Sequence, residues 1–156
     1  MKILITGGAG FIGSNIAIYL KKLGHHIQTM DNFSRLGSKL NLIELKKYNI
    51  KNFKADVTNF TTLKKFKNFD LIIDCCAEPS VESSKKNLDL TFYTNLVGTY
   101  NILKIASEMK AKLIFLSSSR IYSIMNIKKL SKLKKSNLIK KFSIKEDFSK
   151  EAPLSF

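Results

Sequence analysis

The sequence predicts an α/β protein built on a doubly wound parallel sheet. Three observations predict it. Short apolar runs of strand length alternate with stretches whose apolar residues recur at helical spacing. A glycine-rich turn stands between the first strand and the first helix, and an acidic residue ends both the second and the third strand. This alternation implies right-handed crossovers and a sheet in the strand order 3-2-1-4-5.

The first strand and the first helix flank the glycine-rich turn. The strand is expected over residues 2–6, and the second strand over the apolar run 27–30, which ends at Asp31. Five apolar residues of the helix between them should share one face: Ile12, Ile16, Tyr19, Leu20 and Leu23.

The turn has the pattern Gly7-x-x-Gly10-x-x-Gly13, which is typical of a Rossmann-type dinucleotide-binding site in this strand–helix context. Gly7 allows the tight turn, Gly10 lets a pyrophosphate approach the backbone, and Gly13 lets the helix pack closely on the sheet. The helix N-terminus, at Phe11 and Ile12, presents N–H groups to the phosphates. A glycine-rich turn without a ligand is the alternative.

Asp31 completes this half-motif because it follows the strand next along the chain. Its carboxylate can accept hydrogen bonds from both hydroxyls of an adenosine ribose. The same negative charge disfavours a 2′-phosphate, so the sequence predicts NAD as the cofactor.

The later elements continue the alternation. They are expected as a helix over 38–48, a strand over 53–56, a helix from Asn59 or Thr61 to about Phe66, a strand over 70–76, a loop over 78–86, a helix over 88–109 and a strand over 112–116. The fourth strand is nearly all apolar, so both its faces should be buried. The apolar faces of the long helix should include Leu96, Tyr100, Leu103 and Met109. The sheet is expected to be incomplete on its C-terminal side.

Composition fits one globular domain with a hydrophobic core, since 44% of the 156 residues are hydrophobic. The net charge of +15 is uneven, with eight lysines between residues 128 and 145. We interpret this lysine-rich segment as a solvated insertion, and a nucleic-acid or other acidic partner is the less favoured alternative.

No apolar stretch approaches the length of a membrane span, and Gly7 and Gly8 interrupt the first apolar run too early for a signal peptide. We therefore expect a cytoplasmic protein without membrane contact. Cys75 and Cys76 lack metal-ligand spacing, which favours two buried thiols and no metal site.

Several motifs occur together in the order found in one known family. They are Thr6–Ser14, Asp31–Arg35, Asp56-Val57, Asn95–Thr99 and Ser117–Tyr122. The chain resembles the NAD-dependent epimerase/dehydratase family, the extended short-chain dehydrogenase/reductases that act on nucleotide sugars. Two details are most similar to its CDP-paratose 2-epimerase (CDP-tyvelose epimerase) group: Asp31–Arg35 followed by Asn41-Leu42, and Ser117–Ser123 followed by Glu146–Phe148 and Ala152–Ser155.

The resemblance assigns roles to further residues. It implies that Asn32 and Arg35 lie near the adenosine, Asp56 and Val57 near the adenine, and Ala77 under the ribose and nicotinamide, while Asn95 braces the site and Ser118 hydrogen-bonds the sugar hydroxyl. Without the resemblance, Asp56 reads equally well as a helix cap, Asn95 as a partner for backbone groups, and the three serines as a turn.

The resemblance also bears on the reaction. Family members that decarboxylate or dehydrate carry an acid where this chain has Arg120, so the arginine favours an epimerase. The family's catalytic Tyr-x-x-x-Lys is absent after the serines, because Asn126 stands four residues after Tyr122. Tyr100 and Lys104 have the spacing but precede the serine strand, so we interpret them as a structural coincidence in which Tyr100 packs and Lys104 is solvated.

A Pro-x-Ser-x segment leads into the catalytic tyrosine in this family, and residues 153–156 match it. We therefore expect the chain to end just before its base and to be inactive alone. Residues 1–122 should form the NAD-binding domain, and residues 123–156 the lysine-rich insertion and the approach to the catalytic motif.

The expected function is the N-terminal part of a nucleotide-sugar epimerase that inverts a carbinol through a transient ketone. A homodimer is possible in the complete enzyme. A non-catalytic NAD-binding module and a nucleotide-sugar oxidoreductase are the alternatives.

Overall fold

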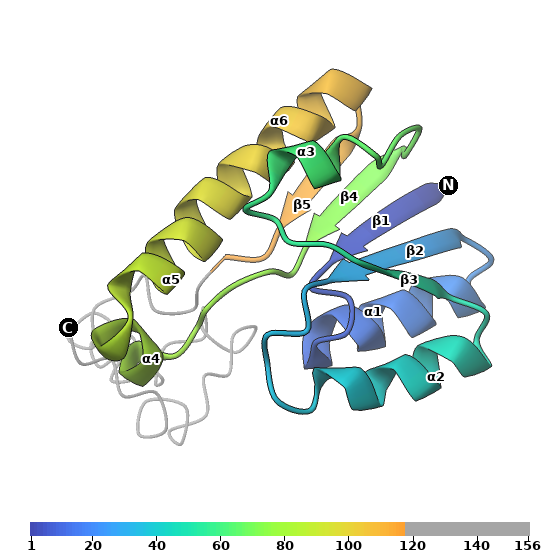
Figure 1. The fold of residues 1–156 in the computed structure, drawn as a ribbon. Helices are drawn as coiled ribbons and strands as arrows, with labels where there is room; N and C mark the ends of the chain where they lie inside the picture. Colours follow the sequence, from blue (N-terminus) through green and yellow to red (C-terminus); the bar gives the residue numbers. More distant parts are fainter. Residues whose placement is uncertain (118–156) are drawn as a thin grey trace, which may run out of the picture. The chain divides into compact units, whose positions relative to one another are not determined.

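The computed structural model describes residues 1–117, and Met1–Leu116 form one compact unit. Five parallel strands form a sheet in the order β3-β2-β1-β4-β5 (Figure 1). The strands are β1 (Lys2–Thr6), β2 (His26–Asp31), β3 (Lys51–Lys54), β4 (Leu71–Asp74) and β5 (Lys112–Phe115). The predicted fold class and strand order are confirmed.

Helical segments connect the strands and lie on both faces of the sheet (Figure 1). They are α1 (Phe11–Lys22), η1 (Ser38–Leu40), α2 (Asn41–Lys47), α3 (Phe60–Leu63), α4 (Val81–Lys86), α5 (Leu88–Phe92), η2 (Tyr93–Gly98) and α6 (Thr99–Met109).

The sheet separates two hydrophobic layers because successive side chains of each strand point to opposite faces. In β1, Ile3 and Ile5 pack with Ala17 of α1 on one face. Leu4, between them, packs with Leu63 of α3 and with α6 on the other face. With both faces covered, the central strands are apolar throughout, as parallel sheets require.

The predicted packing face of α1 is confirmed only in part, since of its five residues Ile16 and Leu20 pack against the core. Ile12, Tyr19 and Leu23 are each more than half exposed, whereas the buried positions are Gly13, Ser14 and Ala17. Small residues let the helix axis approach the sheet closely, which hydrophobic periodicity alone does not report.

The predicted helix over 88–109 consists of three segments, of which η2 has π-helical hydrogen bonding. Its Gly98 lies so close to the β3–α3 connection that a Cβ there would come within 2.6 Å of Val57 Cγ2. Of the four residues predicted for the apolar faces of the helix, Leu96, Tyr100 and Leu103 are more than half exposed, so the prediction is confirmed for Met109 alone. The core-facing residues follow i, i+3, i+4, i+7 spacing: Ile102, Ile105, Ala106 and Met109.

Two strands are shorter than predicted at their carboxyl ends, because a side-chain carboxylate turns the backbone there. Asp56 Oδ1 accepts the Thr58 N–H at 2.8 Å just after β3 ends. Asp74 Oδ1 accepts the Cys76 N–H at 3.1 Å just after β4 ends. Local side-chain acceptors of this kind compete with strand pairing.

Two helices also differ from the prediction, one in where it ends and the other because a loop was expected there. Asn59 caps α3 by accepting the Thr62 N–H at 3.0 Å, but the helix ends at Leu63 instead of Phe66. The expected loop over 78–86 contains α4, whose cap Ser80 accepts the Ser83 N–H at 3.1 Å. A six-residue helix shows too little apolar repeat to be predicted from periodicity.

Candidate cofactor-binding site

A cleft opens where the carboxyl ends of the parallel strands meet, the usual place for a ligand in such a sheet. Its walls come from the connections after β1, β2, β3 and β4 and from the α5–η2 segment. They are Gly7, Gly10, Asp31, Asn32, Ser34, Arg35, Ser38, Ala55, Val57, Cys75, Cys76, Ala77, Glu78, Leu90 and Thr94.

The glycine turn forms the floor between the two halves of the cleft. Gly7 has a φ of +61°, and a Cβ there would lie 2.8 Å from the Cys75 carbonyl oxygen. The Gly10 N–H donates to the Gly7 carbonyl at 2.9 Å and closes the turn. The first N–H groups of α1, from Phe11 to Gly13, have no partner within the helix, so they are available to an anion.

Asp31 stands at the carboxyl end of β2 with 9% of its surface exposed. Its Oδ2 accepts the Ala9 N–H at 3.1 Å, and its Oδ1 accepts the Phe33 N–H at 2.8 Å. These bonds fix the carboxylate beside the glycine turn. Because each carboxylate oxygen accepts more than one hydrogen bond, both can still bind ligand hydroxyls in the cleft.

Asp56 lies behind the part of the cleft that is lined by Asn32 and Val57. Its Oδ2 accepts the Asn32 Nδ2–H at 2.8 Å, and its Oδ1 accepts the Thr58 N–H and hydroxyl. Partial burial acts to raise the pKa of Asp56, but these hydrogen bonds outweigh it and hold the pKa below its ordinary value. Asp56 therefore stays ionised and orients Asn32.

Asn101, buried on α6, supports the same side of the cleft. Its Nδ2 donates to the carbonyl oxygens of Val57 at 2.9 Å and Thr58 at 3.2 Å. The helix thereby fixes the backbone that carries Val57 into the cleft.

Asp74 shapes the opposite side of the cleft. It is 1% exposed, and its Oδ1 accepts the Thr6 hydroxyl and the Cys76 N–H. Burial raises the pKa of Asp74 above its ordinary value, although these two hydrogen bonds act against the rise. Burial and the nearby Asp74 charge raise the pKa of Cys75 to about 12 and also raise the pKa of Cys76. Both thiols are therefore protonated at neutral pH.

Asp74→Asn is expected to change how stability depends on pH. The raised pKa means that the folded chain holds the Asp74 proton more tightly than the unfolded chain does, so this stabilisation is lost as pH rises through the folded pKa. The wild type should therefore lose stability relative to Asp74→Asn as pH rises from about 4, the ordinary carboxyl pKa, towards neutrality. Urea unfolding of both chains at several pH values measures this, and a constant difference would contradict it.

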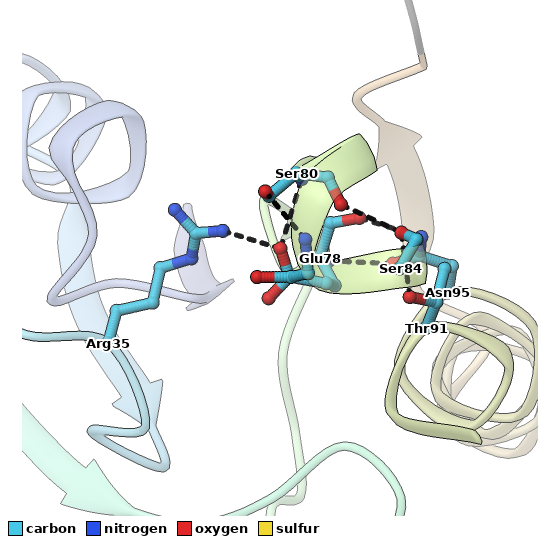
Figure 2. Close-up of polar contacts among 7 residues, drawn as sticks. Arg35, Glu78, Ser80, Ser84, Thr91 and Asn95 are labelled. Carbon is cyan, nitrogen blue, oxygen red and sulfur yellow. Dashed lines mark hydrogen bonds and ion pairs between the residues drawn. The ribbon is translucent and has the colours of Figure 1, made fainter. Parts of the chain in front are cut away.

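Glu78 and Asn95 form a rigid corner on the same side (Figure 2). Asn95 Oδ1 accepts the Glu78 N–H at 2.8 Å, and Asn95 Nδ2 donates to the Glu78 carbonyl at 3.1 Å. The Glu78 carboxylate accepts the Ser80 N–H at 3.0 Å and pairs with Arg35 at 2.9 Å across the cleft.

The predicted cofactor residues fall into two groups. Seven line the cleft: Gly7, Gly10, Asp31, Asn32, Arg35, Val57 and Ala77. Five stand beside or behind it: Phe11, Ile12, Gly13, Asp56 and Asn95. Their contacts with a cofactor stay predictions, and Ser118 lies outside the described residues.

Sequence reasoning missed several cleft residues, above all Glu78, Ser38 and the two cysteines. Cys75 and Cys76 are partly buried against the hydrophobic core and also line the cleft wall, so the expectation of two buried thiols is confirmed only in part. Their position directly after an apolar strand was the available signal. Glu78 had no comparable signal, because its partners come from residues 35 and 95.

Tyr100 and Lys104 lie on α6, and neither lines the cleft. Lys104 Nζ lies 4.4 Å from the centroid of the Phe60 ring, and Tyr100 is more than half exposed. The expectation that Tyr100 packs in the interior was therefore wrong.

The model of the NAD dependent epimerase/dehydratase family matches residues 3–141 of the chain. The chain belongs to this family. Among curated relatives of this epimerase/dehydratase chain, UDP-N-acetyl-α-D-glucosaminuronate decarboxylase from Bacillus cytotoxicus is 37% identical over 121 residues, covering 76% of this chain and 37% of that protein.

Solved structures agree with this family assignment. The UDP-Glc/GlcNAc 4-epimerase from Campylobacter jejuni superposes with a TM-score of 0.72 at 32% identity, covering 78% of this chain and 38% of that chain. A UDP-glucuronic acid 4-epimerase variant from Bacillus cereus was solved with a UDP-sugar analogue and NAD. It superposes with a TM-score of 0.70 at 28% identity, covering 79% of this chain and 42% of that chain. The predicted family and its NAD dependence are confirmed.

This epimerase/dehydratase chain spans between 28 and 42% of the length of the curated relatives that it matches. Within residues 1–117, no helix is long and apolar enough to cross a membrane. The same residues hold no cluster of three His, Cys, Asp or Glu side chains able to ligate a metal.

The order and the chemistry of the surfaces that line the cleft suit a dinucleotide. The glycine turn offers side-chain-free backbone to a pyrophosphate, the Asp31 carboxylate adjoins it, and Ala55 and Val57 supply an apolar wall beyond Asp31. Ala77 lines the opposite half, after β4. A dinucleotide bound across a parallel sheet needs these surfaces in this spatial order.

Proposed function

We propose that this chain binds NAD in the cleft and forms the cofactor-binding part of a nucleotide-sugar epimerase. The observation that carries the proposal is the Asp31 carboxylate, held beside the glycine turn by the Ala9 N–H at 3.1 Å in the same cleft. Family membership and the NAD-bound relatives support it. A homodimer and a cytoplasmic location are part of the same proposal.

Each side of the cleft has a separate task in this proposal. The N-terminus of α1 and the glycine turn bind the pyrophosphate, and Asp31 binds the ribose hydroxyls. Asn32, oriented by Asp56, lies beside the adenosine, with Val57 against the adenine. Bound NAD supplies a hydride acceptor that is regenerated in an epimerase, so this chain's residues need to retain it through many turnovers.

Ser118 has a proposed role in the reaction itself. It follows β5 in the sequence and would hydrogen-bond the sugar hydroxyl that is oxidised. Residues 1–122 would form the NAD-binding domain, with residues 123–156 leading towards the remaining catalytic groups.

The substrate class is proposed from sequence details. Curated relatives act on UDP sugars and a dTDP sugar, as their names state. The similarity of Asp31–Arg35 and Ser117–Ser123 to the CDP-paratose 2-epimerase group supports a CDP sugar, and Arg120 supports epimerisation over decarboxylation or dehydration.

Asp31→Asn is expected to weaken NADH binding about tenfold, because a hydrogen bond to a charged acceptor contributes about 1.5–3 kcal/mol. Binding is measured by NADH fluorescence titration, which is free of tryptophan background because the chain has no Trp. Asp70→Asn is the matched control, since Asp70 lies at the opposite end of β4 and bonds the Lys2 N–H. Equal effects of the two changes would contradict the proposed role of Asp31.

The reaction is tested on the protein purified from the cells that naturally produce it. CDP-paratose and UDP-glucose are supplied as substrates in separate assays. An epimerase converts the substrate without accumulating NADH, whereas an oxidoreductase accumulates NADH in proportion to product. NAD binding without either product would favour the non-catalytic NAD-binding module.

A further inference from the structure

The Arg35–Glu78 ion pair crosses the cleft between connections that follow different strands. Arg35 follows β2 and Glu78 follows β4, and these strands flank β1 on its two sides. Gly7 and Gly10, in the turn that follows β1, line the same cleft as Arg35 and Glu78. A pyrophosphate bound to the glycine turn would therefore share the cleft with this ion pair.

The two side chains of the ion pair are held differently. The Glu78 side chain is only 12% exposed, and both its backbone and its carboxylate are bonded, to Asn95 and Ser80. The Arg35 side chain is 53% exposed and extends from a short connection whose carbonyl accepts the Ser38 hydroxyl at 2.9 Å. The ion pair thus joins a fixed glutamate to a solvent-exposed arginine, and the arginine side chain can rotate away from the glutamate.

We propose that Glu78 is a positioning residue that draws Arg35 across the cleft as a latch over the cofactor pyrophosphate. This inference rests on the proposed binding of NAD. The latch slows both entry and exit of the dinucleotide, which suits an enzyme that regenerates its NAD in every turnover. It contributes little to the equilibrium affinity, because an ion pair whose arginine end is exposed to solvent is weak.

The kinetic signature separates a latch from a binding contact. Opening a latch raises the association and dissociation rates together and leaves Kd nearly unchanged. Losing a contact raises only the dissociation rate. Removing a charge that repels the pyrophosphate would speed association and slow dissociation.

The test uses stopped-flow NADH fluorescence on the purified 156-residue chain, with excess NAD as the displacing ligand. Glu78→Gln is expected to raise both rates about fivefold, near the upper limit for an exposed ion pair. Adding Glu78→Gln to Arg35→Gln should raise neither rate beyond that of Arg35→Gln alone, because both changes open the same latch. Raising the salt concentration should accelerate dissociation from the wild type more than from Glu78→Gln, because only the wild type has an ion pair to screen.

Glu44→Gln is the matched control. Glu44 forms the other ion pair within residues 1–117, with Lys47 on the exposed surface of α2. It should leave both rates unchanged, and thermal unfolding should show that all variants fold.

Three results would overturn the latch. Glu78→Gln could leave both rates unchanged, shift them in opposite directions, or raise dissociation alone with a weaker Kd. A wild-type chain that binds no NADH at millimolar concentration would instead contradict the proposed function, and the latch with it.

Discussion

Gly13→Ala is expected to abolish measurable NADH binding and to lower the free energy of unfolding by about 3 kcal/mol, at the upper end of the usual overpacking range. A Cβ at this position would lie 2.3 Å from the Gly7 carbonyl oxygen and 2.9 Å from Gly8 Cα. Both atoms belong to the backbone, so no side-chain rotation relieves the clash. The helix must move away from β1, and that movement opens the glycine turn which forms the floor of the cleft.

Urea unfolding and NADH titration of the purified chain measure the two effects. Asn15→Ala is the matched control, because Asn15 lies on the exposed face of the same helix two residues later. It should change stability by less than about 0.5 kcal/mol and leave NADH affinity unaltered. A Gly13→Ala chain that binds NADH like the wild type would show that close packing of α1 is unnecessary for the site.

Asn101→Ala is expected to lower the free energy of unfolding by about 2 kcal/mol and to weaken NADH binding as well. The buried Nδ2 donates to the Val57 and Thr58 carbonyl oxygens, and alanine leaves both acceptors without this donor. The backbone that carries Val57 along the adenosine side of the cleft would then lose its fixed position.

The same two measurements, unfolding and NADH titration, check this change. Ser107→Ala on the exposed face of α6 is the control and should alter neither quantity. Loss of stability with unchanged NADH affinity would show that Asn101 supports the fold without shaping the cleft.

The sheet order and the position of the cleft could be predicted from the sequence because both follow from local patterns. Apolar strands that alternate with helices allow few parallel arrangements, and right-handed crossovers reduce them further. Gly7 and Asp31 end neighbouring strands of that sheet, so their meeting at one edge follows from topology.

Helix faces and short helices were predicted less well, for identifiable reasons. On α1, the sheet contacts fall on Gly13 and Ala17, whereas periodicity gives weight to large residues such as Tyr19 and Leu23. The π-helical hydrogen bonding of η2 could not be predicted from a sequence repeat. This segment ends at Gly98, which lies close to Val57 from a distant part of the chain. Polar α4 begins at the Ser80 cap, and a single cap does not distinguish a helix from a turn.

The sequence alone determined the fold class, the family, the NAD cofactor of that family and seven of the fifteen residues that line the cleft, because these depend on residue type at fixed spacing along the chain. Only the tertiary structure decided what Glu78, Asp74 and Asn101 do. Each of these side chains has a partner from a different segment of the chain, such as Arg35 for Glu78 or Val57 for Asn101. Hydrogen bonds and ion pairs act over about 3 Å, and which distant residues come that close is set by the packing of the sheet and its helices.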